Sequence, residues 1–152
     1  MKSISVRALL QFSPTDPTVV PMDVSVERVA EKIVEDHRTR EVYVVDENTH
    51  FLGIITLRRL ARCVFASEIP SKLSATTLLD LVSAETAGDL VLRKPAYVCE
   101  EDTFEHLLGV MFRYDINEIP VVNDDKSIVG NINMIEILCA WREGKLDGLR
   151  TA

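Results

Sequence analysis

The side chains most able to do chemistry, three histidines and three cysteines, are scattered along the chain and show no catalytic or metal-binding spacing. Two histidines at i and i+4 would indicate a zinc site, and cysteines in a C-x-x-C pair would indicate a metal or redox site. A phosphate-binding Gly-rich loop and a Gly-x-Ser-x-Gly nucleophile turn are also missing from the sequence. The sequence therefore predicts no metal site, no required cofactor and no enzymatic activity.

One spacing of residues occurs twice, each time where an apolar run ends and a helical pattern begins. Its members are Gly53, Thr56 and Arg59 in the first half of the chain and Gly130, Asn133 and Glu136 in the second. Glycine permits a ligand to approach the backbone closely, and the first turn of a helix attracts anions. Residues of these types at the start of a helix are therefore compatible with a bound ligand.

The bulk composition limits the classes of partner. The chain has 152 residues, of which 47% are hydrophobic and 27% charged, as in a soluble globular protein. Its net charge of −7 repels polyphosphate backbones, which argues against a general nucleic-acid binder. No window approaches the roughly 18 apolar residues that cross a bilayer, so we expect no membrane insertion and, by default, a cytoplasmic location.

The sequence also contains an internal repeat. The stretch Glu41–Asp46 aligns with Glu118–Asn123 at an offset of 77 residues (118 − 41), and the match continues through the following apolar run. Upstream the offset is 78, where both copies show the i, i+3, i+4, i+7, i+8 apolar pattern of an amphipathic helix. Ser25 and Thr103 stand at the matching N-cap positions. A period of this length indicates duplication of a whole unit.

Each copy is predicted to have the order β-α-β-β-α, which places the chain in the α/β class. The lead strands are Thr18–Val20 and Ala96–Val98, and a short helix precedes each of them. In both copies a polar loop joins two β-branched runs into a hairpin. We divide the chain into a first repeat with its N-terminal lead helix, a linker helix region, a second repeat and a flexible tail, at residues 1–66, 67–85, 86–143 and 144–152.

These elements, in this order, resemble the CBS (cystathionine-β-synthase-type) domain family, and the resemblance extends from about Ser5 to Arg142. It implies a tandem CBS pair, often called a Bateman module, with the two repeats packed about a pseudo-twofold axis. A homodimer of such pairs is usual in the family. The resemblance also implies an adenosine-containing ligand in the clefts between the repeats, such as AMP, ADP, ATP, S-adenosylmethionine or a cyclic dinucleotide.

In the family's Gly-x-x-Thr-x-x-Asp pattern, the acid is suited to accept both ribose hydroxyls. Here the first copy has Arg59 at that position, whereas the second keeps an acid, Glu136, and replaces the threonine with Asn133. The second copy is therefore the preferred nucleoside site, with Tyr97 either stacking on a base or capping the core. By resemblance its residues are Ala96, Tyr97, Val98, Asn117, Glu118, Ile119, Pro120, Asn133 and Glu136.

The first copy is predicted to be the weaker site. Its arginines, including Arg38, Arg40 and Arg58, form either an anion or phosphate site or a solvated basic face paired with nearby acids. In the last helix, Trp141 marks either a subunit contact or core packing. The residues of the weaker site are Thr18, Val20, Thr39, Arg40, Val42, Thr56 and Arg59.

We expect a regulatory protein that senses an adenine nucleotide and transmits its occupancy to an unidentified partner by a small rotation between its halves. One alternative is a dimerisation scaffold that works without a ligand and has degenerate nucleotide sites. Another is a detached regulatory subunit of a transporter or enzyme.

Overall fold

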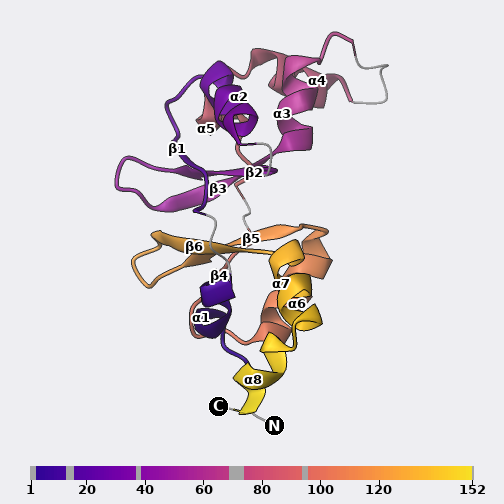
Figure 1. Cartoon of the computed structure of the whole chain (residues 1–152). Coiled ribbons are helices and arrows are strands. Elements are labelled where there is room, and N and C mark those ends of the chain that lie inside the picture. Colours follow the sequence, from indigo (N-terminus) through magenta and orange to yellow (C-terminus); the bar gives the residue numbers. More distant parts are fainter. Residues whose placement is uncertain (1–2, 13–15, 37–38, 69–73, 94–95, 152) are drawn as a thin grey trace. The chain divides into compact units, whose positions relative to one another are not determined.

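The computed structural model of the chain describes residues 3–12, 16–36, 39–68, 74–93 and 96–151. The chain divides into two compact units (Figure 1). The first-repeat unit is Thr18–Pro95, and the second-repeat unit combines Met1–Pro17 with Ala96–Ala152. Each unit has one three-stranded sheet and several helices, which confirms the predicted α/β class. None of the helices in the described stretches has the length and apolar character needed to span a membrane.

The first-repeat unit has a sheet in the order β1-β2-β3, with β1 parallel to β2 and β3 antiparallel to it. The parallel pair requires a crossover, which α2 provides, and β2 and β3 form a hairpin. Helices α2, α3 and α5 lie on one face of the sheet (Figure 1). The elements are β1 (Val19–Pro21), α2 (Val26–Glu35), β2 (Glu41–Val45), β3 (Phe51–Thr56), α3 (Leu57–Val64), α4 (Ala75–Ser83) and α5 (Ala87–Leu90).

The second-repeat unit repeats this topology, with a sheet in the order β4-β5-β6. Helix α6 makes the crossover between the parallel strands β4 and β5, and α7 follows the hairpin. The elements are α1 (Val6–Leu9), the 3-10 turn η1 (Leu10–Phe12), β4 (Val98–Cys99), α6 (Phe104–Tyr114), β5 (Glu118–Val122), β6 (Ile128–Asn133), α7 (Met134–Arg142) and α8 (Lys145–Thr151).

The two sheets pair their strands in the same register. Val20 lies beside Val44 in the first sheet, and Val98 lies beside Val121 in the second. Each hairpin has a register shift directly after Val44 or Val121. Both of these valines are fully buried, each in the apolar core of its own unit. The predicted duplication is therefore confirmed down to single positions.

The crossover helices begin where the sequence predicted. The Ser25 hydroxyl accepts a hydrogen bond from the Arg28 amide at 3.2 Å, and the Thr103 hydroxyl accepts one from the His106 amide at 3.1 Å. These bonds satisfy amides in the first turn that have no partner within the helix. The N-caps thus fix α2 and α6 at equivalent points of the two units.

The short helix α1 belongs to the second-repeat unit, although the sequence placed it with the first repeat. The Val6 amide donates to the Asp102 carbonyl at 2.8 Å, and Val6 is buried in the second-repeat core. In the first-repeat unit, α5 makes the equivalent bond, from the Ala87 amide to the Val24 carbonyl at 2.9 Å. Each short helix thus packs its apolar side chains against the repeat that it does not directly precede.

The region 67–85 contains helix α4, as predicted, but the segment 144–152 differs from the predicted flexible tail. Gly144 has a φ of 71°, a left-handed conformation that suits glycine, and α8 follows it. Leu146 is buried in the second-repeat core, and the Lys145 ammonium lies 5.9 Å from the centre of the Phe12 ring. One buried leucine and a cation–π contact thus dock a segment whose composition is mostly polar.

Candidate functional site

In the first-repeat unit, three segments meet at one end of the sheet. The Thr18 and Thr39 hydroxyls are 3.3 Å apart, and Glu41 lies opposite Thr56 across the hairpin. The Leu57 amide donates to the Arg40 carbonyl at 2.9 Å, which joins the start of α3 to the start of β2. We call this end the first rim. The structure therefore brings together the predicted polar residues of the first copy, Thr18, Thr39, Arg40, Thr56 and Arg59.

The second-repeat unit has the equivalent end, which we call the second rim. The Met134 amide donates to the Asn117 carbonyl at 2.8 Å, and Glu118 lies opposite Asn133. Tyr97 precedes β4, which is parallel to β5, and its side chain is 48% exposed. About half of Tyr97 is therefore open to solvent at this end of the sheet. The second rim therefore presents Tyr97, Asn117, Asn133 and Glu136.

The polar residues at the helix starts act first as N-caps. The Thr56 hydroxyl accepts from the Arg59 amide at 3.1 Å, and the Asn133 carboxamide oxygen accepts from the Ile135 amide at 2.8 Å. Asparagine is as good an N-cap as serine or threonine, so the replacement of the threonine preserves the helix start. The positive end of each helix dipole points to the rim, where it favours an anionic ligand group.

The residues one turn later, Arg59 and Glu136, occupy equivalent positions but have opposite charges. The Arg59 guanidinium donates from Nε to the Leu90 carbonyl at the end of α5. Glu136 lies next to Leu9 and Phe12, where it lines a small pocket between α7 and the N-terminal segment. The first rim thus uses this position to hold a helix, whereas the second rim keeps a partly exposed carboxylate.

Glu118, predicted to line a base pocket, is buried, with 6% of its surface exposed. Its carboxylate accepts a hydrogen bond from the Asn131 side chain at 2.6 Å. Glu41 has the same degree of burial at the equivalent position of the first-repeat unit. A buried acid requires polar partners, so both residues contribute to the architecture of the rims. The repetition of glutamate at both strand starts was the sequence signal for this role.

Several predicted site residues are parts of the apolar cores. These residues are buried as a whole, with 0–2% of their surface exposed, so they support the rims from within and offer almost no surface to a ligand. Pro120 and Ala96 are buried as well, outside the two principal clusters. The core residues in question are Val20 and Val42 in the first-repeat unit and Val98 and Ile119 in the second-repeat unit.

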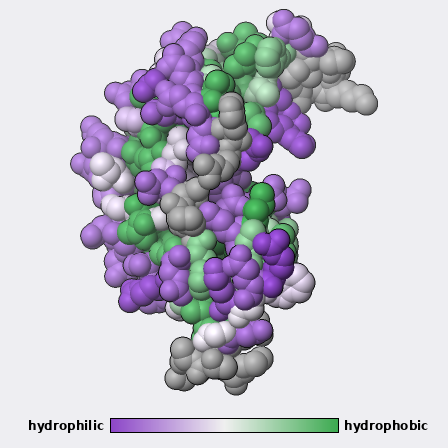
Figure 2. Space-filling view, in the orientation of Figure 1, coloured by the Kyte–Doolittle hydropathy of each residue, from purple (hydrophilic) through white to green (hydrophobic). Residues whose placement is uncertain are grey.

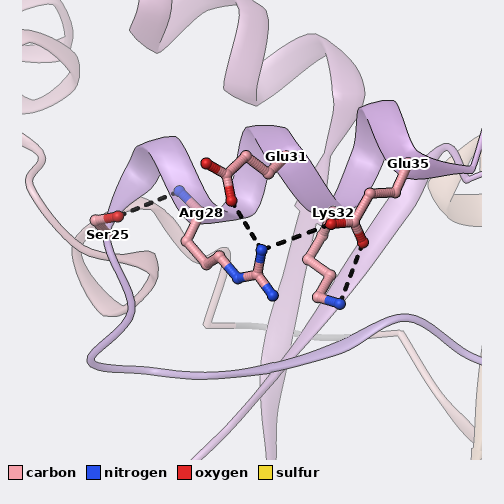
Figure 3. A network of polar contacts seen from close by, with 5 residues as sticks. All are labelled: Ser25, Arg28, Glu31, Lys32 and Glu35. Carbon is pink, nitrogen blue, oxygen red and sulfur yellow. Dashed lines mark hydrogen bonds and ion pairs between the residues drawn. The ribbon is translucent and has the colours of Figure 1, made fainter.

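The basic residues predicted around the first rim are only partly gathered there. Arg40 and Arg58 are exposed, and Arg59 turns toward Leu90. Arg38 lies outside the described residues. On helix α2, Glu31 accepts a hydrogen bond from Arg28 and Glu35 accepts one from Lys32 (Figure 3). The first rim therefore keeps two exposed guanidinium groups near its helix start.

The described residues contain no group of three or more histidine, cysteine or acidic side chains that would hold a metal ion. Burial raises the pKa of the Cys63 thiol and of the Cys99 thiol. Both thiols are therefore less ionised at neutral pH than a free cysteine, and a thiolate nucleophile is disfavoured at either position.

A family profile described as the CBS domain matches this chain twice, at residues 8–66 and 87–143. The chain belongs to the CBS domain family. The two matched segments cover both repeats, so the predicted tandem CBS pair is confirmed. The profile boundaries leave α4 between the two matched segments and α8 after them.

Solved structures of CBS proteins resemble the whole chain. A CBS domain-containing protein from Thermotoga maritima is 28% identical, with a TM-score of 0.79, over 95% of this chain and 98% of that one. The CBS domain pair of protein MJ0100, in complex with 5′-methylthioadenosine and S-adenosyl-L-methionine, is 19% identical, with a TM-score of 0.70. CBSX2 in complex with AMP is 19% identical, with a TM-score of 0.72. For each of these two the match covers 93% of this chain and 98% of the other.

One curated relative is a much longer protein. A homoserine O-acetyltransferase from Methanobrevibacter ruminantium is 27% identical over 123 residues, which are 81% of this chain. The matched part is 22% of the length of that acetyltransferase. The CBS pair therefore corresponds to about a fifth of this relative.

Proposed function

We propose that this CBS pair is a regulatory module that binds an adenosine-containing nucleotide at the second rim and does no catalysis of its own. The observation that carries the proposal is the carboxylate of Glu136, which lies one turn inside α7, next to the N-cap Asn133. Such a carboxylate accepts hydrogen bonds from two neighbouring hydroxyl groups, as a ribose presents them. The start of α7 then favours the phosphate or another anionic group of the ligand.

Tyr97 supplies the third part of the proposed site. Its ring is about half exposed at the start of β4, at the same end of the sheet as Asn117. An exposed aromatic ring offers a flat apolar surface on which a purine stacks. The second rim thus combines a base platform, a hydroxyl acceptor and an anion-favouring helix start. The ligands present in the MJ0100 and CBSX2 structures support the adenosine class.

Thermal unfolding of the chain with AMP, ATP, S-adenosylmethionine and cyclic di-AMP tests the proposal. A ligand at 100 times its Kd raises the free energy of unfolding by about 2.7 kcal/mol. For a chain of this size, that corresponds to an increase in Tm of roughly 5 to 10 °C. The proposal fails if none of the four ligands raises the Tm.

The variant Glu136→Gln locates the site, because it removes the charge and keeps the shape. Hydrogen bonds to a charged group contribute about 1.5–3 kcal/mol, so we expect Kd to rise about 10- to 150-fold. The matched control is Asp125→Asn, an exposed acid in the β5–β6 loop, which should bind the nucleotide like the parent chain. Equal affinities of the two variants would place the ligand elsewhere.

A second candidate, a scaffold that needs no ligand, is favoured by the first rim alone. There Arg59 stands where a ribose would need an acid, and its guanidinium is directed to the Leu90 carbonyl. We infer that the first rim takes no nucleoside and that its exposed Arg40 and Arg58 favour an anion. Isothermal titration separates the candidates: a sensor binds one nucleotide per chain, with a higher Kd in Glu136→Gln, whereas a scaffold binds none.

A regulated partner completes the proposal. The curated relative carries its matched segment within a much longer acetyltransferase, which supports a role as the regulatory part of a larger enzyme or assembly. Affinity capture of the tagged chain, with and without the nucleotide that raises its Tm, tests this step. A protein whose capture changes with the nucleotide is the expected result.

A further inference from the structure

The short helices α1 and α5 are equivalent in the two units, but the chain leaves them in different conformations. They begin 81 residues apart (87 − 6), so Leu10 corresponds to Val91. Gln11 then corresponds to Leu92. After α5, Val91 has a ψ of 140° and the chain continues extended. After α1, Leu10 has a ψ of −28° and the chain continues as the 3-10 turn η1. The two paths thus separate at one backbone angle.

The extended path allows the first-repeat unit to add a short strand to its sheet. Leu92 pairs with Ile54 on β3, and the Leu92 amide donates to the Ile54 carbonyl at 3.0 Å. This pairing requires a glycine beside it, because a Cβ at Gly53 would lie 2.1 Å from the Leu92 carbonyl oxygen. A glycine inside a strand often marks such a close approach of two backbones. The added strand therefore explains the glycine in β3.

The second-repeat unit keeps the glycine without the pairing. Within residues 3–12 and 96–151, no β-bridge joins η1 to β6. A Cβ at Gly130 would meet two methyl groups of Leu10, at 2.9 and 4.0 Å, and no backbone atom of the described residues within 4 Å. In this conformation, then, no other backbone segment approaches Gly130, whereas a strand like that at Leu92 would need the glycine.

The 3-10 turn is weakly held and places Phe12 at two sites at once. None of its three residues is fully buried, and 3-10 hydrogen bonds have poorer geometry than those of an α-helix. Phe12 and Glu136 line a pocket of about 10 Å³, which has room for one water at most. The Phe12 ring also lies 5.9 Å from the Lys145 ammonium on α8. Phe12 thus fills the space beside Glu136 while it contacts α8.

We propose that the segment Leu10–Phe12 switches between the 3-10 turn and a strand that pairs with β6, as Leu92 pairs with β3. A change of ψ at Leu10 from −28° to the extended value of Val91 begins the strand, and both values lie in allowed regions. Gln11 then lies beside Asn131, which is the equivalent of Ile54 at the repeat offset. Gly130 gives the two backbones the room that they need.

In the strand form Phe12 leaves its pocket. Its equivalent after α5 is Arg93, which is exposed, so we expect the Phe12 ring to turn to the solvent. This one movement opens the space beside Glu136 and separates the ring from Lys145. The segment therefore couples the second rim to α8. The switch does not depend on the proposed function, but its use in transmitting nucleotide binding from Glu136 to α8 rests on that function.

Exposure of Phe12 makes the strand the minor form. The ring loses apolar burial, and the strand gains a backbone hydrogen bond. The cost is limited, because the chain already exposes Phe65 and Phe112, to 57% and 70%. Figure 2 shows hydrophobic side chains at the surface over α3 and α4. We expect about 1–10% of the molecules in the strand form, within the usual range of a minor conformation.

Relaxation-dispersion NMR of the parent chain, without nucleotide, tests for this minor form. We expect exchange at the amides of Leu10–Phe12 and of Asn131. Gly130→Ala should abolish the exchange, because its Cβ blocks the approach of the second backbone and displaces only a methyl group of Leu10 in the 3-10 turn. Exchange should persist in the control Gly109→Ala, whose Cβ would meet no neighbouring element within 4 Å. No exchange in the parent chain, or undiminished exchange in Gly130→Ala, would overturn the proposal.

A strand variant makes the minor form the major one. The changes Leu10→Val and Gln11→Leu give the segment the residues of Val91 and Leu92, and valine favours an extended backbone. We expect a nuclear Overhauser contact between positions 11 and 131 and slow hydrogen exchange of the amide at position 11. Adding Gly130→Ala should remove both signals, whereas adding Gly109→Ala should not. A strand variant that keeps the 3-10 turn would contradict the proposal.

Trypsin digestion then tests the coupling to α8. The strand variant retains Phe12 but moves its ring away from Lys145, so cleavage after Lys145 should be several-fold faster than in the parent chain. Gly130→Ala in the same variant should slow the cleavage again. Unchanged cleavage in a variant that has the contact between positions 11 and 131 would show that the segment does not act on α8. These tests use no nucleotide, so their failure is distinct from failure of the proposed sensing function.

Discussion

The Arg59 guanidinium donates a hydrogen bond from Nε to the backbone carbonyl of Leu90, and so joins the first turn of α3 to the end of α5. The last carbonyls of a helix have no partner within the helix, and a cation near them is favoured. Arg59 stands at the repeat position of Glu136. At this one position the two repeats have diverged. The first repeat has an arginine that links α3 to α5, and the second repeat has a carboxylate.

Replacing Arg59 with leucine should lower the free energy of unfolding by about 1 kcal/mol, less than the roughly 1.5–3 kcal/mol of a hydrogen bond to a charged group, because Arg59 is partly exposed. Urea denaturation followed by circular dichroism measures this change. The control is Arg58→Leu, because Arg58 is exposed and a surface substitution of this kind usually changes stability by less than about 0.5 kcal/mol. Equal midpoints for the two variants would mean that the Leu90 contact contributes no stability.

Gly53 and Gly130 are equivalent in the repeat but differ in the room around them. A Cβ at Gly53 would lie 2.1 Å from the Leu92 carbonyl oxygen, a backbone atom that cannot move away alone. A Cβ at Gly130 would lie 2.9 Å from a terminal methyl group of Leu10, which a change of rotamer removes. The same substitution should therefore have unequal effects.

We expect Gly53→Ala to destabilise the chain by about 1–3 kcal/mol or more, as an overpacked core does. Gly130→Ala should cost less than about 1 kcal/mol, the range of a side-chain rotamer change. Urea midpoints of both variants, measured side by side, test the order. A larger loss of unfolding free energy in Gly130→Ala than in Gly53→Ala would show that the backbone at Leu92 moves away more easily than the side chain of Leu10.

The repeat could be predicted from the sequence because its signals are local. An N-cap at Ser25 or Thr103 and the apolar pattern after it act within one helix, and both were confirmed. The partner of α1 could not be predicted in this way. Its Val6 and Leu9 would bury equally well against either repeat, and only long-range bonds, such as that from Val6 to Asp102, decide between them.

In the candidate site, too, the local features could be predicted from the sequence and the long-range contacts could not. The spacing of Gly130, Asn133 and Glu136 located the start of α7, and the structure brings Asn133 to the same rim as Asn117. The partner of Arg59 could not be foreseen, because Leu90 is 31 residues away and contributes only a backbone carbonyl, which any residue has. Burial of Glu118 likewise depends on Asn131, across the hairpin.

Asp89 makes the stability of the first-repeat unit depend on pH. Its carboxylate closes a capping box at the start of α5, where it accepts hydrogen bonds from the Glu85 and Thr86 amides and the Thr86 hydroxyl, each at 3.1 Å. The Glu85 amide, followed by the two Thr86 donors, lowers the pKa of Asp89 below its usual value. A carboxyl whose pKa is lower in the folded chain stabilises the fold above its ordinary pKa, and this stabilisation is lost as the pH falls through the folded pKa.

The variant Asp89→Asn should therefore be less stable than the parent chain at pH 7. The difference should shrink as the pH falls below about 4, the ordinary range of an aspartate pKa. Unfolding free energies at steps between pH 7 and pH 3 measure this. Asp125→Asn, in an exposed loop, is the control and should follow the parent chain at every pH. If the difference in unfolding free energy between the parent chain and Asp89→Asn stayed constant across this range, the proposed role of the capping box would be contradicted.

Leu146 attaches the C-terminal segment to the second-repeat core, and its replacement tests whether this segment stabilises the fold. Its side chain is 6% exposed, packed in the second-repeat core, while its neighbour Lys145 is largely in solvent and bonds Glu143. Leu146→Ala leaves a cavity in that core and should destabilise the chain by about 2–4 kcal/mol. Lys145→Ala removes only an exposed ion pair and a weak cation–π contact, so it should cost less than about 1 kcal/mol.

Urea denaturation compares the two variants, and limited trypsin digestion gives an independent measure. Trypsin cleaves after Lys145, inside α8, only when that helix opens, so Leu146→Ala should be cut there faster than the parent chain. A loosely attached tail would give no difference in unfolding midpoint and equally fast cleavage in both chains. Because α8 lies beyond the matched CBS segments, a loss of 2 kcal/mol or more would mean that this chain needs an element outside the family's common fold to stabilise its second repeat.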